Sequence, residues 1–259
     1  MSRFKDIKDI IVIQTLEEYG FRAWAALETE IYDGWVLRFA NGYTGRSNSI
    51  NPLYTSTLDL DTKLAYCADW YATRGITHRY RLNDAMQPPE LEAVLERKGY
   101  VLDNESLVMT MNLADVGVIV SDGEVNIQGH YTDEWLTNFC LLHPAHAPHR
   151  ATIQAIMDRM PTTKYFASIV ANGEVIAMGL GIQEDDYVGL YDIITRQDQR
   201  GKGYSKHLVS SILHCAALTG VKKAYLQVME DNAPARRVYE KAGFRLVYRY
   251  WYRVPPTQS

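Results

Sequence analysis

The second half of the chain repeats four segments of the first half in the same order. In both halves a helical stretch ends at a glycine, Gly75 or Gly220, and a strand pattern follows directly. A second helix then leads to another glycine, Gly99 or Gly243, and a second strand. The glycine-to-glycine distances are 24 residues (99 minus 75) and 23 residues (243 minus 220). Such a repeat predicts a duplicated α/β domain, with helices and a mixed sheet in each copy.

The repeat places the domain boundary in the middle of the chain. The 259 residues are 47% hydrophobic and 22% charged, which suits two ordinary globular domains. Polar and small residues interrupt the pattern between Asn112 and Asp122. We therefore expect one domain over residues 1–120 and a second over residues 123–259, which opens with a strand at Glu124 and a helix at Asp133.

Charge and composition exclude several classes of partner. The formal net charge is −4, so no basic field argues for nucleic acid. No apolar run approaches the roughly 18 residues of a membrane span, and the run 10–13 is too short for a secretory signal. The 3 cysteines are isolated and odd in number, which favours buried thiols over disulfides. We expect a cytoplasmic protein that binds neither membrane nor nucleic acid, and its oligomeric state stays open.

A short glycine-containing turn joins the apolar run 188–195 to a helical pattern that begins near Tyr204. Its residues are Gln199-Arg200-Gly201-Lys202-Gly203-Tyr204-Ser205. Glycines allow a tight backbone, and the first amides of a helix form a site for a phosphate. A dinucleotide loop fits less well because a third glycine is missing, and a Walker loop is excluded by its spacing. The turn alone is also compatible with an ordinary solvated loop.

Two motifs together resemble the GNAT superfamily of N-acyltransferases. Arg200-Gly201-Lys202-Gly203-Tyr204-Ser205 resembles the loop of that family that binds the pyrophosphate of acetyl-coenzyme A, with Ser205 in the last small position. Asn232, Ala235, Tyr239 and Gly243-Phe244 resemble its second signature, Asn-x-x-Ala-x-x-x-Tyr-x-x-x-Gly-Phe. The resemblance covers residues 124–254 and implies an acetyl-coenzyme A-dependent N-acetyltransferase that needs no metal.

The resemblance also assigns roles to residues. It implies that the donor binds to the strand end and loop, with Asn232 and Ala235 nearby; the strand and loop residues are Ile193, Ile194, Thr195, Arg200, Gly201, Lys202, Gly203, Tyr204 and Ser205. One amide of the strand end would stabilise the oxyanion. Tyr239 matches the general acid that protonates the leaving thiolate. Asp192 and Glu184 are candidates for the base by location only.

The first domain departs from the family pattern. Tyr239 aligns with Leu95, so the acid is missing, and the segment 55–63 has no glycine and carries Asp59 and Asp61. Carboxylates there would repel a phosphate. The resemblance therefore implies two GNAT-like domains in tandem, the first degenerate and the second active. The acceptor is a small-molecule or peptide amine that the sequence does not identify, and the acyl chain length stays open.

Alternative interpretations remain at three places. The second domain could be an acyl-coenzyme A-binding regulatory or interaction module without turnover, or, more distantly, a nucleotide-binding enzyme. Three histidines at 143, 146 and 149 invite a metal site, but two prolines break the helix there and a polar, mobile loop is favoured. The polar segment 35–52 is interpreted as a solvated hairpin around Asn41-Gly42. The alternative, that it forms a wall facing the acceptor, is less favoured.

Overall fold

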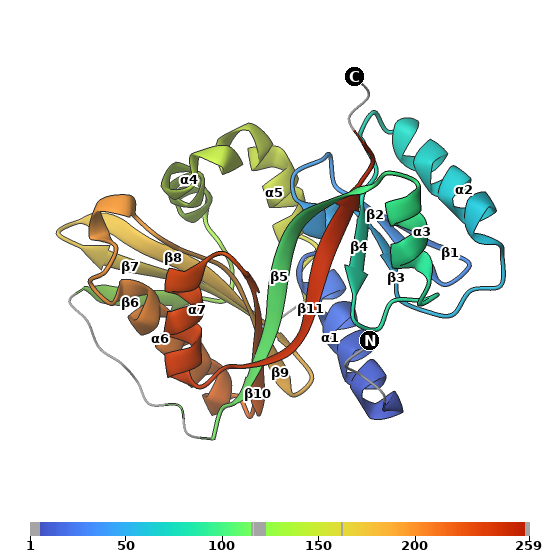
Figure 1. The fold of residues 1–259 in the computed structure, drawn as a ribbon. Coiled ribbons are helices and arrows are strands. Elements are labelled where there is room, and N and C mark those ends of the chain that lie inside the picture. Colours follow the sequence, from blue (N-terminus) through green and yellow to red (C-terminus); the bar gives the residue numbers. More distant parts are fainter. Residues whose placement is uncertain (1–5, 115, 117–122, 162, 257–259) are drawn as a thin grey trace. The chain divides into compact units, whose positions relative to one another are not determined.

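The computed structural model describes residues 6–114, 116, 123–161 and 163–256. It is a mixed α/β structure, as predicted, and the chain divides into two compact units (Figure 1). Unit 1 comprises Met1–Leu107, Met229–Asp231 and Val247–Ser259, and unit 2 comprises Val108–Val228 and Asn232–Leu246.

The units divide the chain at places that the sequence pattern does not mark. Strand β5 (Val101–Asn112) begins in unit 1 and ends in unit 2, whereas β11 (Arg245–Val254) begins in unit 2 and ends in unit 1. Each half of the chain thus gives the end of its closing strand to the other unit. The predicted boundary between residues 120 and 123 falls on positions outside the described part. The division into residues 1–120 and 123–259 stays a prediction.

Unit 1 has a sheet in the order β1-β2-β3-β4-β11, antiparallel except where β3 runs parallel to β4. Its elements are α1 (Ile7–Ala23), β1 (Glu28–Tyr32), β2 (Trp35–Phe39), β3 (Ile50–Pro52), α2 (Leu60–Ala72), β4 (Tyr80–Asn83) and α3 (Leu91–Arg97). Apolar residues of β2 and β4 face α2 and α3, where Trp35, Leu64 and Leu95 belong to one buried cluster. Alternation along a strand sends the neighbouring residues to the opposite face.

That opposite face holds buried charges. Arg81 on β4 forms an ion pair with Glu17 of α1, and both side chains are no more than 3% exposed. Tyr248 of β11 donates a hydrogen bond to the same carboxylate. Arg38 on β2 donates to the backbone oxygens of Phe21 and Trp24. Buried charges persist only when they are paired and hydrogen-bonded, so α1 is joined to the sheet by specific polar contacts.

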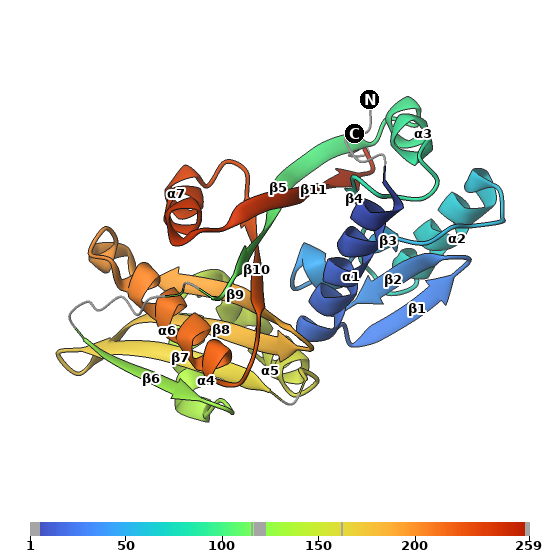
Figure 2. The same ribbon diagram turned by 90° about the horizontal axis from the view of Figure 1, so that it is seen from below.

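Unit 2 has a sheet in the order β6-β7-β8-β9-β10, antiparallel except for the parallel pair β9–β10. Its elements are β6 (Glu124–Gln128), α4 (Asp133–Leu142), α5 (Arg150–Met157), β7 (Lys164–Ala171), β8 (Glu174–Glu184), β9 (Tyr187–Thr195), α6 (Tyr204–Leu218), β10 (Lys223–Met229) and α7 (Ala233–Ala242). Helices α4 and α5 cover one face of this sheet and α6 covers the other (Figures 1 and 2). An Asn-Gly turn joins β7 to β8, with Asn172 at φ 53° and Gly173 at φ 78°.

Two expectations are corrected. The polar segment 35–52 is not a solvated hairpin, because Arg38, Asn48 and Asn51 are at most 4% exposed. Asn48 accepts from the amides of Ala40 and Gly42 and donates to the Thr44 carbonyl, so these polar groups satisfy one another. The histidine segment is a short 3₁₀ helix, Pro144–His149, rather than a polar loop. It folds back on α4, so that the ring of His146 stacks on that of Phe139, with 4.7 Å between the ring centroids.

Candidate active site

Strand β9 carries a bulge near its end. Met178 of β8 pairs with Ile194 and Leu180 pairs with Tyr191, so Asp192 and Ile193 together face Gly179. Asp192 takes a left-handed backbone conformation, with φ 47°. A Cβ at Gly179 would lie 2.4 Å from Cδ1 of Ile193, so any larger residue here would displace that side chain. The sequence analysis missed this glycine, although a glycine inside an apolar strand is a signal for a bulge.

The end of β9 is also no longer paired with β10, its parallel neighbour. The ladder with β10 runs from Lys223↔Tyr187 to Leu226↔Leu190, and Ile193 and Thr195 lie beyond the last pair. The amide of Arg196 donates to the Ile176 carbonyl on β8 at 2.9 Å. Because amides alternate along a strand, those of Ile193 and Thr195 point away from β8, toward the side where the ladder has ended. Two of the three predicted strand-end residues thus direct an amide to this side, and Ile194 does not.

The glycine turn leads from β9 into α6. Gly201 and Gly203 have φ values of 81° and 89°, the left-handed region that favours glycine. Gly203 is the N-cap of α6 and supplies no side-chain cap, and the first helical bond is donated by the amide of His207. The amides of Tyr204 and Ser205 in the first turn precede that bond, so they are available to an anion.

The two cations of the turn are held beside it by the chain itself. Nζ of Lys202 donates to Oε1 of Gln199 at 2.9 Å, and Nε of Arg200 donates to the Thr195 carbonyl at 3.4 Å. The ring of Tyr204 is 8% exposed and packs inward, so Tyr204 contributes its backbone rather than its phenol to the turn. The local geometry therefore presents amides and positive charge together.

Helix α7 holds the second group of predicted residues. Oδ1 of Asn232 accepts from the amide of Ala235 at 3.2 Å, which caps the helix. The Asn-x-x-Ala spacing thus has a local structural cause. No residue of α7 is fully buried. Its apolar side, with Ala235, Val238 and Tyr239, is only half-buried, which leaves surface on which a ligand could pack.

Tyr239 and Asp192 are brought together by α7 and the bulge. The phenol ring packs edge-on against Phe244, with 5.9 Å between ring centroids. Burial, and next the negative charge of Asp192, raise the pKa of Tyr239 to about 12. The phenol is therefore protonated at neutral pH.

Glu184, the other candidate base, lies at the far end of the same hairpin. It pairs with Tyr187, at the opposite end of β9 from the bulge. Asp192 is five residues further along (192 minus 187), or roughly 16 Å at about 3.3 Å per residue. Of the two carboxylates, Asp192 is the one whose charge acts on the phenol of Tyr239.

The equivalent helix start in unit 1 is closed by carboxylates. Oδ1 of Asp59 accepts from the amide of Thr62 at 2.9 Å, and Asp33 accepts from the amides of Thr57 and Leu58. These bonds hold the pKa of Asp33 well below its ordinary value, the amide of Leu58 first. Asp61 instead forms an ion pair with Lys98. The sequence analysis missed Asp33, whose carboxylate comes from the β1–β2 turn, far away in the sequence.

The described residues contain neither a membrane-spanning helix nor a metal-binding cluster. No helix among them is long and apolar enough to cross a membrane. Within the same residues, no group of three or more histidine, cysteine, aspartate or glutamate side chains could hold a metal ion.

Known proteins resemble this chain in sequence over most of its length. The chain is 24% identical over 251 residues to the uncharacterized N-acetyltransferase YobR of Bacillus subtilis, covering 93% of this chain and 98% of that protein. It is 26% identical over 248 residues to the probable histone acetyltransferase Rv0428c of Mycobacterium tuberculosis, covering 95% and 74%.

Solved structures agree on the fold. A GCN5-related N-acetyltransferase from Kribbella flavida matches with a TM-score of 0.70 at 13% identity, over 98% of both chains. A tandem GNAT protein from the clavulanic acid biosynthesis pathway matches with a TM-score of 0.65 at 13% identity, over 94% of this chain and 89% of that one.

The family model described as the C-terminal region of the probable histone acetyltransferase Rv0428c matches residues 12–253. With the bulged strand, the glycine turn and the relatives in agreement, the chain belongs to this family of the GNAT superfamily and is an acyltransferase.

Proposed function

We propose that the chain transfers an acetyl group from acetyl-coenzyme A to a primary amine, by direct attack in a ternary complex, and that unit 2 holds the reaction. The observation that carries the proposal is the uncapped start of α6, directly after a strand whose ladder with β10 has ended. No acylated side chain is needed, since the amine itself supplies the nucleophile.

The residues of unit 2 fit this donor. The amides of Gly203 to Ser205, with Arg200 and Lys202, suit a diphosphate. The half-buried side of α7 with Ala235 would pack against the rest of the donor. When bound, acetyl-coenzyme A supplies the activated acetyl thioester. We assign Asn232 a supporting role, because its side chain is used to cap α7.

The same side chains account for the chemistry. The amide of Ile193 or Thr195 would donate to the carbonyl oxygen as negative charge develops there. Tyr239, which keeps its proton at neutral pH, would donate it to the departing sulfur. We assign Asp192, whose charge acts on that phenol, as the carboxylate that receives a proton from the incoming amine. The acceptor is a small-molecule or peptide amine.

We also propose that unit 1 has no donor site of its own. Asp33 and Asp59 accept the hydrogen bonds that a phosphate would otherwise receive from the amides around the start of α2. Leu95, which stands in the place of Tyr239, is fully buried in the core and carries no proton to donate. Unit 1 is then a degenerate acetyltransferase domain that serves as a scaffold.

Release of free thiol from acetyl-coenzyme A, measured across a panel of primary amines, tests the proposed reaction. We expect amine-dependent release, with the acetyl group recovered as an amide of the amine by mass spectrometry. Tertiary amines of similar size serve as the matched control, because they cannot yield a stable amide. Tight donor binding without thiol release on any amine would contradict catalysis and favour a regulatory binding module.

A charge placed in the first turn of α6 separates donor binding from helix stability. Ser205→Asp is expected to stabilise α6 by about 0.3–1 kcal/mol, because a carboxylate favours a helix N-terminus. The same charge repels a phosphate, and a repulsion of about 1.4 kcal/mol raises KM for acetyl-coenzyme A about ten-fold. Steady-state kinetics and a thermal melt measure both effects, with Ser205→Ala as the control. An unchanged KM for acetyl-coenzyme A in Ser205→Asp would contradict the binding of the diphosphate at this turn.

A further inference from the structure

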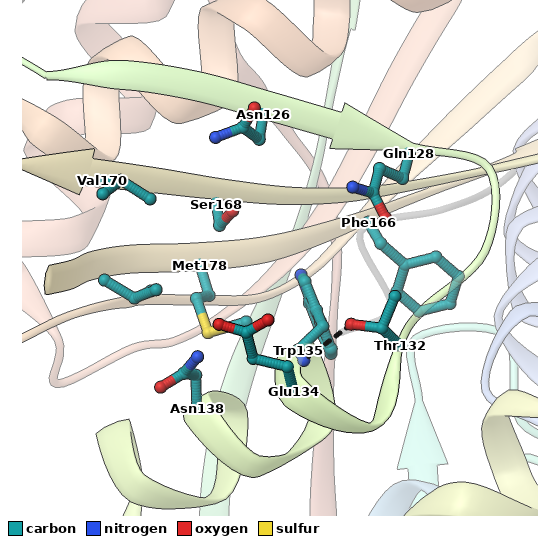
Figure 3. Close-up of a pocket in the computed structure, with 11 residues that line it drawn as sticks. Asn126, Gln128, Thr132, Glu134, Trp135, Asn138, Phe166, Ser168, Val170 and Met178 are labelled. Atoms are coloured by element: carbon teal, nitrogen blue, oxygen red, sulfur yellow. Dashed lines mark hydrogen bonds between the residues drawn. The ribbon is translucent and has the colours of Figure 1, made fainter. Parts of the chain in front are cut away.

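A concave site lies in unit 2, on the face of the sheet that carries α4. It is a groove of about 170 Å³ between α4 and strands β6, β7 and β8, called here the α4 groove (Figure 3). Met178 and Phe166 form part of its apolar wall. Gly179, next to Met178 on β8, faces Leu208 of α6 instead. The α4 groove is therefore on the opposite face of the sheet from α6, and the proposed acetyl transfer does not use it.

The polar side chains of the groove come from three elements and converge on it. Asn126 and Gln128 extend from β6, Ser168 from β7, and Glu134 and Asn138 from α4 (Figure 3). They provide amide, hydroxyl and carboxylate groups that can each form hydrogen bonds. The volume holds roughly five to six water molecules at about 30 Å³ each, which suits a small molecule with few heavy atoms.

Trp135 gives the groove an unused hydrogen-bond donor. Its side chain is 8% exposed, and Nε1 has no acceptor among the described residues. The indole stacks on Phe139 and meets Phe166 edge-on, which fixes its plane. Figure 3 shows the indole nitrogen on the side of the ring that faces Ser168 and the groove. A buried donor without an acceptor is costly, so a ligand that brings an acceptor atom gains a hydrogen bond there.

The charge of the groove selects the ligand. Glu134 is the one charged side chain that lines it among the described residues, and no lysine, arginine or histidine does so. An anion would find no partner, whereas an ammonium group would find the Glu134 carboxylate and the amide oxygens of Asn126 and Asn138. The aromatic wall of Trp135 and Phe166 also favours a cation. Because no cation is present to pair with a ligand carboxylate, the acceptor offered to Trp135 must be neutral.

We propose that the α4 groove binds a small amine that also carries a neutral acceptor oxygen, such as an amino amide or an amino alcohol. Glu134 holds its ammonium group, and Nε1 of Trp135 donates to its oxygen. The site is separate from acetyl transfer, so it binds small amines without consuming them.

The indole signal of Trp135 tests this directly in the full chain. Of the 5 tryptophans, Trp135 alone belongs to unit 2. In protein labelled with ¹⁵N-tryptophan, its peak is the one absent from the Trp135→Phe variant. Three probes of similar size are titrated: glycinamide, acetamide, which lacks the ammonium group, and ethylamine, which lacks the oxygen. We expect a saturable shift with glycinamide, and at least ten-fold weaker binding of the other two.

Two charge variants complete the test. Glu134→Gln is expected to weaken glycinamide binding at least ten-fold. Glu124→Gln, an exposed carboxylate of β6 outside the groove, leaves it unchanged, and so does Tyr239→Phe. In each variant that keeps Trp135, a ligand-free Trp135 peak away from the random-coil position verifies that unit 2 is folded. No saturable shift with glycinamide, equal binding of all three probes, or full binding in Glu134→Gln would overturn the proposal, whatever the outcome of the acetyl-transfer assay.

Discussion

Tyr239→Phe is expected to lower kcat by about 100-fold or more, the usual contribution of a positioned general acid. The substitution removes only the hydroxyl, so the ring keeps its edge contact with Phe244 and the fold is unchanged. KM for acetyl-coenzyme A should stay within about three-fold, because the proton is needed in the transition state and not for donor binding. Stopped-flow detection of the released thiol measures both constants. Wild-type kcat in this variant would remove Tyr239 from the mechanism.

The raised pKa of Tyr239 adds a pH dependence with a defined sign. Since the pKa is about 12, the acid form persists throughout the neutral range, and loss of its proton should not limit kcat below about pH 10. Asp192→Asn removes a negative charge that raises this pKa, so the pKa of Tyr239 should fall. Tyrosine-selective NMR, with the peak assigned by its absence in Tyr239→Phe, measures it. An unchanged pKa of Tyr239 in Asp192→Asn would show that the charge of Asp192 does not act on the phenol.

Glu17→Gln is expected to lower the free energy of unfolding by about 3–5 kcal/mol, because Arg81 keeps a buried charge without its partner. Both side chains are nearly inaccessible to water, so solvent cannot replace the lost carboxylate. Four of the 5 tryptophans lie in unit 1, and their fluorescence during urea unfolding follows this unit. Asp61→Asn breaks an ion pair whose carboxylate is 80% exposed, and it should cost at most about 1 kcal/mol.

The Glu17 result also tests the exchange of strand ends. Tyr248, in the part of β11 that belongs to unit 1, donates to the same carboxylate. Tyr248→Phe should therefore also lower the free energy of unfolding that tryptophan fluorescence measures, although Tyr248 lies 231 positions from Glu17 in the sequence. Equal stability of Glu17→Gln and Asp61→Asn would contradict a buried ion pair at the centre of this unit.

Local patterns predicted several elements of unit 2 and the turn at its candidate site. The helix at Asp133 and the glycine turn before α6 each depend on nearby residues, and both are confirmed. Periodicity also identified the repeat and the mixed α/β fold. These features could be inferred because caps, turns and amphipathic faces are specified within one or two turns of chain.

The features that escaped prediction all depend on contacts between distant segments. Asp33 closes the start of α2 from another turn, and the buried charges of Arg38 and Arg81 look solvated in the sequence. The bulge at Asp192 was missed because it depends on the register with β8 and on Gly179. Exchange of the ends of β5 and β11 has no local signature at all, since each strand reads as continuous.

Hydrogen exchange with and without saturating acetyl-coenzyme A, followed by mass spectrometry, tests the central claim most directly, because it reports which amides the donor covers. We predict slower exchange over residues 191–206, which include the end of β9 and the first turn of α6, and no change over residues 55–63 of unit 1. Protection of residues 55–63, or none over residues 191–206, would contradict the assignment of the donor to unit 2.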